Sequence, residues 1–208
     1  MSGMPTSRTY GDACPIARAL DAVGERWALL VVRELLLGPQ RFSDLRRALP
    51  AASSNMLTDR LRELESHGVV TRRRLPAPAA STVYDLTPSG RELEPIVLAL
   101  GGWGARFPVP GRGHLSATSV LLFLRGSRFP DPRAVFRIDV DDQVWTVRTA
   151  GDEVRVEPGP PAAPDAALRT DAATLNDLLG DPTGLTAAIA AGRATVAGDV
   201  SALVGLLR

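Results

Sequence analysis

Few side chains in this chain of 208 residues could carry catalytic chemistry. Its one cysteine, Cys14, and its two histidines, His67 and His114, are too few for a zinc site of the Cys/His type. The sequence also lacks a glycine-rich phosphate loop and a Ser/His/Asp set at a favourable spacing. It therefore predicts no catalytic residues, no metal and no cofactor, and we expect its function to come from binding.

A row of hydrogen-bonding side chains lies in the segment SNMLTDRLRELESHG, residues 54–68. At helical spacing the three leucines of this segment form one packing face. The opposite side carries four residues that could bind base edges in the major groove of DNA: Asn55, Thr58, Asp59 and Arg62. Asp59 could instead orient a neighbouring arginine, Arg60 or Arg62, without contacting a base. An ordinary solvated helix face explains the same row equally well.

Arginine supplies the groups that could bind the DNA backbone. All 24 basic residues are arginine, whose planar donors suit phosphates and guanine edges. The phosphate candidates share a basic or hydroxyl group close to the polar row: Arg41, Ser53, Ser54, Arg60, Arg72, Arg73 and Arg74. The two serines could equally cap a helix, which is the more common use. Adjacent strand residues point to opposite faces, so we expect at least one of the three consecutive arginines to be structural.

The charge is divided along the chain. A net charge of +1 argues against a nucleic-acid-binding protein. However, the chain has 14 arginines and 11 acidic residues up to Arg106, and 10 and 12 after it. The segment FPVPGRG that follows has the composition of a linker. We therefore predict a DNA-binding domain at residues 1–106, a linker at 107–114 and a second domain at 115–208.

The first half reads as helices followed by a hairpin. Apolar spacing and Gly or Pro stops predict helices over 16–23, 25–38, 41–50 and 54–68, with Ser43 as a candidate cap for the third. A strand through Val70 breaks at Pro76 and Pro78 and resumes over 82–86. Two short helices joined by a tight turn and followed by a basic hairpin are typical of a winged helix-turn-helix. A solvated edge hairpin is the alternative for the arginine-bearing part.

Three blocks of this half resemble one family of regulators. They are CPIARALDAVGERWALLVVRELLLGPQRFSDLRRALP, MLTDRLRELESHGVV and VYDLTPSGRELEPIVLALGGWG, which together span Cys14 to Gly104. The chain resembles the HxlR-type winged-helix transcriptional regulators. The resemblance implies a homodimer that binds a palindromic DNA operator, with two recognition helices about one DNA turn apart. It also implies that the protomers pair through residues 14–23 and 91–106.

The second half predicts a small sheet covered by helices. Residues 116–124 fit a helix or a strand, with Ser116 as a possible cap. Alternating apolar residues then predict a three-stranded antiparallel meander over 136–156. A strand, a helix capped near Asp171, a second helix, a strand and a final helix follow. The predicted fold class of the whole chain is therefore α+β.

This order resembles the sterol-carrier-protein-like domain over residues 115–208, with its best matching segments in TDAATLNDLL and GRATVAGD. The resemblance implies a curved antiparallel or mixed sheet with an apolar cavity for lipids or other hydrophobic molecules, and no catalytic machinery. The candidate lining residues are apolar side chains of the predicted strands and helices: Leu121, Phe136, Ile138, Trp145, Val147, Leu175, Leu178 and Leu179. Any one of them could instead be ordinary core, in a filled domain that serves only dimerisation. Trp145 stands out because its N–H needs a partner.

The sequence thus predicts a dimeric regulator, with repression as the first hypothesis, whose operator binding responds to a hydrophobic small molecule in the second domain. One alternative is a redox-responsive regulator in which Cys14, at a helix start that favours the thiolate, forms an intersubunit or mixed disulfide, and the second domain is structural. Another is a lipid or metabolite carrier tethered to DNA. With no long apolar run and no leader-like segment, we expect a cytoplasmic protein without a membrane span.

Overall fold

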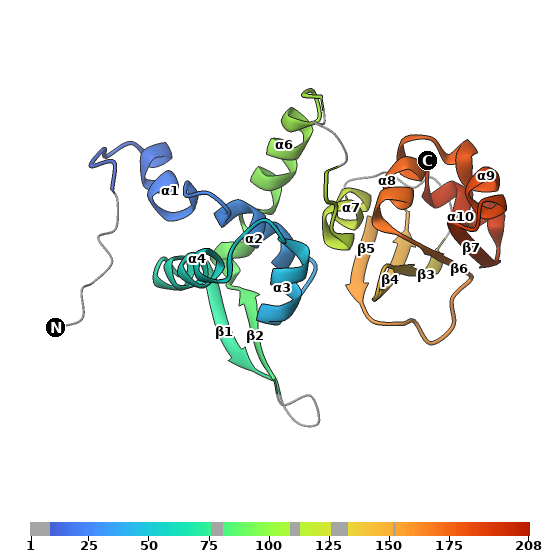
Figure 1. Cartoon of the computed structure of the whole chain (residues 1–208), viewed down its shortest axis with the longest axis horizontal. Helices are drawn as coiled ribbons and strands as arrows, with labels where there is room; N and C mark the ends of the chain where they lie inside the picture. Colours follow the sequence, from blue (N-terminus) through green and yellow to red (C-terminus); the bar gives the residue numbers. More distant parts are fainter. Residues whose placement is uncertain (1–8, 76–80, 109–112, 126–132, 152) are drawn as a thin grey trace. The chain divides into compact units, whose positions relative to one another are not determined.

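The computed structural model describes residues 9–75, 81–108, 113–125, 133–151 and 153–208. The chain divides into two compact units between Arg106 and Phe107, and each combines helices with a sheet (Figure 1). Residues 109–112 of the predicted linker lie outside the described residues, as does the predicted hairpin turn at Pro76 and Pro78.

The first unit contains the predicted helices and hairpin. Its elements are α1 Pro15–Val23, α2 Ala28–Leu35, α3 Phe42–Ala48, α4 Ser54–Ser66, β1 Val70–Arg74, β2 Thr82–Leu86, α5 Pro88–Arg91 and α6 Glu94–Gly104. Helix α2 is central: Val31, Val32 and Leu35 are fully buried. The hairpin of β1 and β2 extends away from the helices of this unit (Figure 1).

Three helix starts differ from the prediction, and the first helix begins only one residue earlier, at Pro15. The second helix begins at Ala28 rather than at Glu25, because Trp27 has the left-handed φ of 78° and ends any continuous helix there. The third begins at Phe42 with Arg41 at the N-cap, where the Asp44 carboxylate accepts the Arg41 amide proton at 3.3 Å. Ser43 was therefore the wrong candidate for the cap, because it already lies inside the helix.

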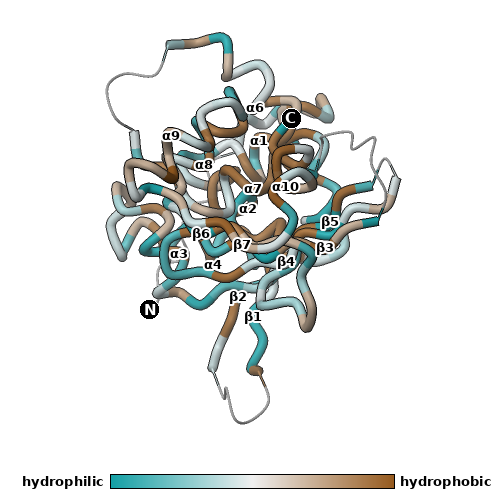
Figure 2. Tube along the Cα trace, turned by 90° about the vertical axis from the view of Figure 1, so that its right-hand side faces the viewer, coloured by the Kyte–Doolittle hydropathy of each residue, from teal (hydrophilic) through white to brown (hydrophobic). Residues whose placement is uncertain are grey.

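The hairpin pairs in a register that separates the three arginines. Arg72 lies opposite Tyr84 and Arg74 opposite Thr82, whereas Arg73 lies opposite Val83 on the other face. Arg73 therefore shares a face of the hairpin with the buried Val83. Strand β1 is hydrophilic along its arginines (Figure 2).

The segment after the hairpin is fixed by one threonine and one glycine. Thr87 caps α5 by accepting the Gly90 amide proton at 3.0 Å, and its hydroxyl donates to the Gly68 carbonyl at 2.6 Å. A Cβ on Gly90 would lie 2.1 Å from the Val69 carbonyl oxygen. Glycine is thus required where α5 approaches Val69, between α4 and β1, so the LTPSG motif (residues 86–90) serves the packing of these segments.

The second unit is a mixed five-stranded sheet with helices. Its elements are α7 Ala117–Leu124, β3 Ala134–Val140, β4 Gln143–Ala150, β5 Glu153–Pro158, β6 Ala166–Thr170, α8 Ala172–Gly180, the 3-10 helix η1 Pro182–Gly184, α9 Leu185–Ala190, β7 Ala194–Gly198 and α10 Val200–Leu206. The strand order is β5-β4-β3-β6-β7, with β3 and β6 parallel and the other pairs antiparallel. The predicted meander is confirmed. The ambiguous segment is the helix α7, capped by Ser116.

The sheet has one buried face. Phe136, Ile138 and Val140 of β3 alternate with less buried residues, and the registers place Trp145 and Val147 of β4 beside them. Such alternation is expected of a sheet covered on one side.

Helix α8 begins at a charged cap. Asp171 accepts the Thr174 amide proton at 2.7 Å and the Thr174 hydroxyl proton at 2.9 Å. Partial burial works to raise the pKa of Asp171, but these hydrogen bonds together lower it below its usual value.

Candidate nucleic-acid interface

Helix α4 presents the predicted polar row to solvent. Leu57, Leu61 and Leu64 are buried against the rest of the first unit, as the spacing predicts. Asn55 is exposed on the other side, and the side chains of Asp59 and Arg62 have exposed fractions of 63% and 73%. These three positions fall within an arc of about 60° on the helix surface. The row can therefore enter a groove without disturbing the core.

Three residues of the row already have partners within the helix. Arg62 Nη1 lies 3.6 Å from Asp59 Oδ1, which matches the predicted alternative that Asp59 orients an arginine. The Thr58 hydroxyl donates to the Ser54 carbonyl at 2.8 Å, so Thr58 has its oxygen lone pairs and its methyl group left for an outside contact.

The start of α4 is held by side chains. Ser53 is the N-cap and accepts the Met56 amide proton at 3.2 Å. The Ser54 hydroxyl accepts from Arg46 Nη1 at 2.6 Å, and the same nitrogen lies 3.3 Å from the Ala52 carbonyl oxygen. Arg46 thus fixes the turn between α3 and α4, a role that sequence reasoning missed because no local pattern pairs residues 46 and 54.

Arg60 is on a different side from the row. Its side chain is only 14% exposed, its Nε donates to the Arg26 carbonyl at 3.1 Å, and it forms ion pairs with Glu25 and Glu63. We therefore leave Arg60 out of the phosphate-contacting set, since its donors tie α4 to the turn between α1 and α2.

The β1–β2 hairpin is the wing of the predicted winged helix-turn-helix. One of its three arginines forms an ion pair within the protein, as expected. Arg73 donates twice to Asp85 Oδ2, at 2.9 and 3.2 Å, and Arg91 donates to Asp85 Oδ1 at 2.7 Å. Asp85 is buried, so this carboxylate joins the wing to α5. Arg72 and Arg74, on the opposite face of β1, are exposed and suitably placed for phosphate.

Arg41 and Met56 are two further exposed residues, one beside the hairpin and one on α4. Arg41 Nε donates to the Ser81 hydroxyl at 3.1 Å, which holds Arg41 against the wing. Met56 is 42% exposed on the first turn of α4 and was missed by the polar pattern because it is apolar. An exposed apolar group at that place can contact a thymine methyl.

The candidate ligand residues of the second unit are mostly core. Seven of them are buried: Leu121, Phe136, Ile138, Trp145, Val147, Leu175 and Leu178. Leu179 is half-buried. Leu178 lines a small pocket of about 130 Å³ beside η1. The indole Nε1 of Trp145 is buried and has no hydrogen-bond partner in the part of the chain that the structure describes.

Cys14 is exposed at the N-cap of α1. Its amide donates to Asp12 Oδ1 at 2.9 Å, which fixes the chain where the helix begins. The thiol is thus open to reagents in solution.

Among the described residues no helix is long and apolar enough to cross a membrane.

A helix-turn-helix with an exposed polar row on its second helix, followed by an arginine-bearing hairpin, defines a winged helix-turn-helix DNA-binding protein. The chain belongs to the HxlR-like helix-turn-helix family, whose model matches residues 22–110. It is a transcriptional regulator of this type. Residues 128–206 match the SCP-2 sterol transfer family.

Similar proteins cover the first unit. An uncharacterized HTH-type transcriptional regulator of Synechocystis sp. is 40% identical over 95 residues, which are 46% of this chain and 70% of that protein. The uncharacterized HTH-type transcriptional regulator YvaP of Bacillus subtilis is 39% identical over 100 residues, 48% of this chain and 93% of its own length. Among solved structures, the redox regulator HypR in its oxidized form is 37% identical, with a TM-score of 0.44, and covers 47% of this chain and 100% of that chain.

Proposed function

We propose that a homodimer of this chain binds a palindromic DNA operator and reads it through the exposed row of α4. Asn55 would bind adenine, Arg62 guanine, and Asp59 either a cytosine amino group or Arg62. The observation that carries this proposal is the position of the row, opposite the buried leucines of α4. Arg72, Arg74 and Arg41 would bind phosphates and set the position of the helix.

The proposed dimer rests on exposed apolar side chains of the first unit. Ile96, Leu100 and Trp103 follow one another at helical spacing on α6 and are each about half exposed, and Ile16 of α1 is 71% exposed. These side chains lie in the two segments that the family resemblance predicts to pair, and they support an interface between two copies.

Selection of binding sites from random DNA tests this proposal. We expect palindromic sites whose half-sites have centres about 10 base pairs apart, because two recognition helices of a dimer lie about one DNA turn apart. Recovery of a single unrepeated half-site, or no enrichment, would contradict the proposed mode of binding.

For the second unit we propose a hydrophobic effector that changes the operator affinity. The buried and unpartnered Trp145 N–H supports a molecule that is largely apolar and carries a hydrogen-bond acceptor. The ligand must bind one dimer geometry better than the other, since equal affinity for both would leave the equilibrium between them unchanged. Catalysis forms no part of the proposal.

Native mass spectrometry of the purified chain tests for such a molecule. We expect a co-purified apolar compound in the parent and less of it in Trp145→Phe, which keeps an aromatic ring and removes the donor. Operator binding measured with and without the compound then tests the coupling. If the parent and Trp145→Phe retain the compound equally, Trp145 does not donate a hydrogen bond to it.

The exposure of Cys14 supports a second candidate function, in which oxidation of its thiol releases DNA through an intersubunit or mixed disulfide. The test compares operator binding of the parent and Cys14→Ser after treatment with oxidised glutathione. If the variant releases DNA as readily as the parent, Cys14 is not the sensor.

A further inference from the structure

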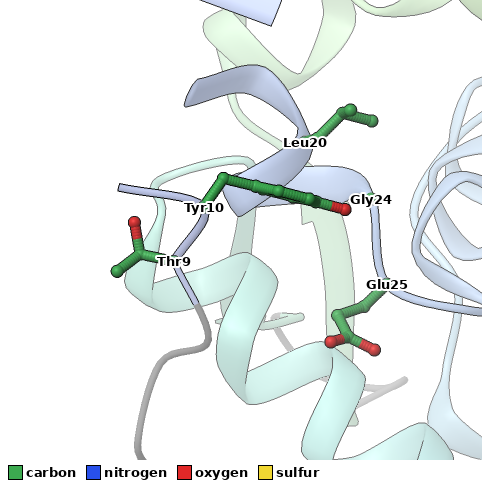
Figure 3. A pocket seen from close by; sticks show the side chains of 5 residues that line it. All are labelled: Thr9, Tyr10, Leu20, Gly24 and Glu25. Carbon is green, nitrogen blue, oxygen red and sulfur yellow. The ribbon is translucent and has the colours of Figure 1, made fainter. Parts of the chain in front are cut away.

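A pocket of about 380 Å³ lies beside the turn between α1 and α2, away from the exposed row of α4. Its volume falls in the range of small-molecule sites. The pocket is lined by Thr9, Tyr10, Leu20, Gly24 and Glu25. In Figure 3 the Tyr10 ring extends toward Gly24, with Leu20 on one side of it and the Glu25 carboxylate on the other.

One carboxylate holds the backbone segment that carries the aromatic side chain of this pocket. Asp21 accepts the Tyr10 amide proton at 2.8 Å and the Thr9 hydroxyl proton at 3.0 Å. Gly11, at a φ of 64°, turns the chain directly after Tyr10. The backbone of the segment before α1 is therefore fastened to α1, while the Tyr10 side chain itself is 66% exposed.

Gly24 forms the end of the pocket nearest the turn. A Cβ at this position would lie 2.5 Å from the Leu20 carbonyl oxygen, so a larger residue would require the backbone to move. The pocket thus combines an aromatic ring, an aliphatic side chain and one acidic group within a short stretch of backbone.

The acidic group is only partly neutralised. Arg60 of α4 ion-pairs with both Glu63 and Glu25, and its Nη2 lies 3.7 Å from Glu25 Oε2, which is longer than a hydrogen bond. The Glu25 side chain is 46% exposed. One guanidinium is therefore shared by two carboxylates, and Glu25 can accept a second cation.

We propose that this pocket binds a small organic cation with an aromatic or aliphatic body. The ammonium group contacts the Glu25 carboxylate and the Tyr10 ring face. The body of the ligand packs on Leu20, which belongs to the α1 segment of the proposed dimer, so the ligand binds beside that interface. A cation there competes with Arg60 for Glu25, and it weakens the contact that ties the α1–α2 turn to α4. Operator affinity falls as a result. This regulatory part rests on the proposed DNA-binding function, whereas the pocket does not.

Calorimetry with three probes of one shape tests the pocket. 2-Phenylethylamine is cationic, 2-phenylethanol is neutral and phenylacetate is anionic. We expect saturable binding of the amine at least about fivefold tighter than that of the alcohol, and none of the acid. Glu25→Gln removes the preference for the amine, whereas Glu157→Gln, at a 58% exposed position on β5 of the second unit, keeps it. Equal affinities for amine and alcohol, or no saturable binding, overturn the site.

Fluorescence anisotropy with the selected operator tests the regulation. At constant ionic strength, adjusted with NaCl, saturating 2-phenylethylamine raises the Kd of the parent about threefold or more. The operator affinity of Glu25→Gln does not respond to the amine. Amine binding without a change in the Kd of the parent overturns the regulatory part. If the chain selects no DNA sequence, the proposed DNA-binding function is refuted. The calorimetry then still tests whether the pocket binds the amine.

Discussion

Asp85→Asn should weaken the wing of the first unit, because one buried carboxylate joins three groups. Asp85 accepts from Arg73 of β1, from Arg91 of α5 and, at 2.9 Å, from the amide of Leu86. Asparagine keeps the shape and can still accept the Leu86 amide proton. It loses the negative charge and places an amide group beside a guanidinium.

The structure sets the magnitude. The Asp85 side chain is 11% exposed, but both arginine side chains are 48% exposed and can be solvated once the carboxylate is gone. Each ion pair is therefore worth less than a fully buried one, and we expect Asp85→Asn to lower the free energy of unfolding by about 1–2 kcal/mol. Asp85→Ala should cost about 1 kcal/mol more, because the buried Leu86 amide then loses its acceptor.

Amide hydrogen exchange of β1 and β2 measures this cost within the full chain. A loss of 1–2 kcal/mol raises exchange rates about tenfold where exchange requires local or global unfolding. Asp59→Asn, at an exposed position of α4, is the matched control and should change these rates less than about twofold. If the amides of β1 and β2 exchange at the same rates in Asp85→Asn and Asp59→Asn, Asp85 does not fasten the wing.

Three more changes test other parts of the structure. Because the pKa of Asp171 is lowered by the Thr174 hydrogen bonds, its stabilisation is present above the usual value of 3.8 and is lost as the pH falls through the lower, folded-state value. Asp171→Ala should thus cost about 1 kcal/mol at pH 7, as measured by urea unfolding, and the difference should shrink below pH 3.8. Leu61→Ala, in the core under α4, should lower the unfolding free energy by about 2–5 kcal/mol; a loss below 1 kcal/mol would contradict the packing. Ile96→Glu should shift sedimentation toward the monomer and weaken operator binding, while Thr195→Glu on the exposed strand β7 should do neither.

Much of the fold could be predicted because periodicity reports burial. The spacing of Leu57, Leu61 and Leu64 predicts the packing side of α4, and the alternation at Phe136, Ile138 and Val140 predicts a sheet with one covered face. Both are confirmed. The start of α2 was predicted wrongly, since the helical pattern over residues 25–38 gives no sign of the left-handed φ of Trp27.

The side-chain network around α4 could not be predicted in the same way. Arg60 and Arg62 are both arginines of one helix, yet one contacts the α1–α2 turn and the other is exposed. That difference depends on Arg26 and Glu25, some 35 residues earlier, which no helical pattern includes. The same holds for Arg73, whose partner Asp85 is twelve residues away across the hairpin.

The ratio of operator to random-DNA affinity in Arg62→Ala tests the central claim most directly. Arg74→Ala on the wing is the matched control. We expect Arg62→Ala to lower operator affinity by about 1–3 kcal/mol with little change on random DNA, so the ratio falls at least about fivefold. Arg74→Ala should weaken both affinities alike and reduce the salt slope by about one. Equal losses on operator and random DNA in Arg62→Ala would contradict readout through α4.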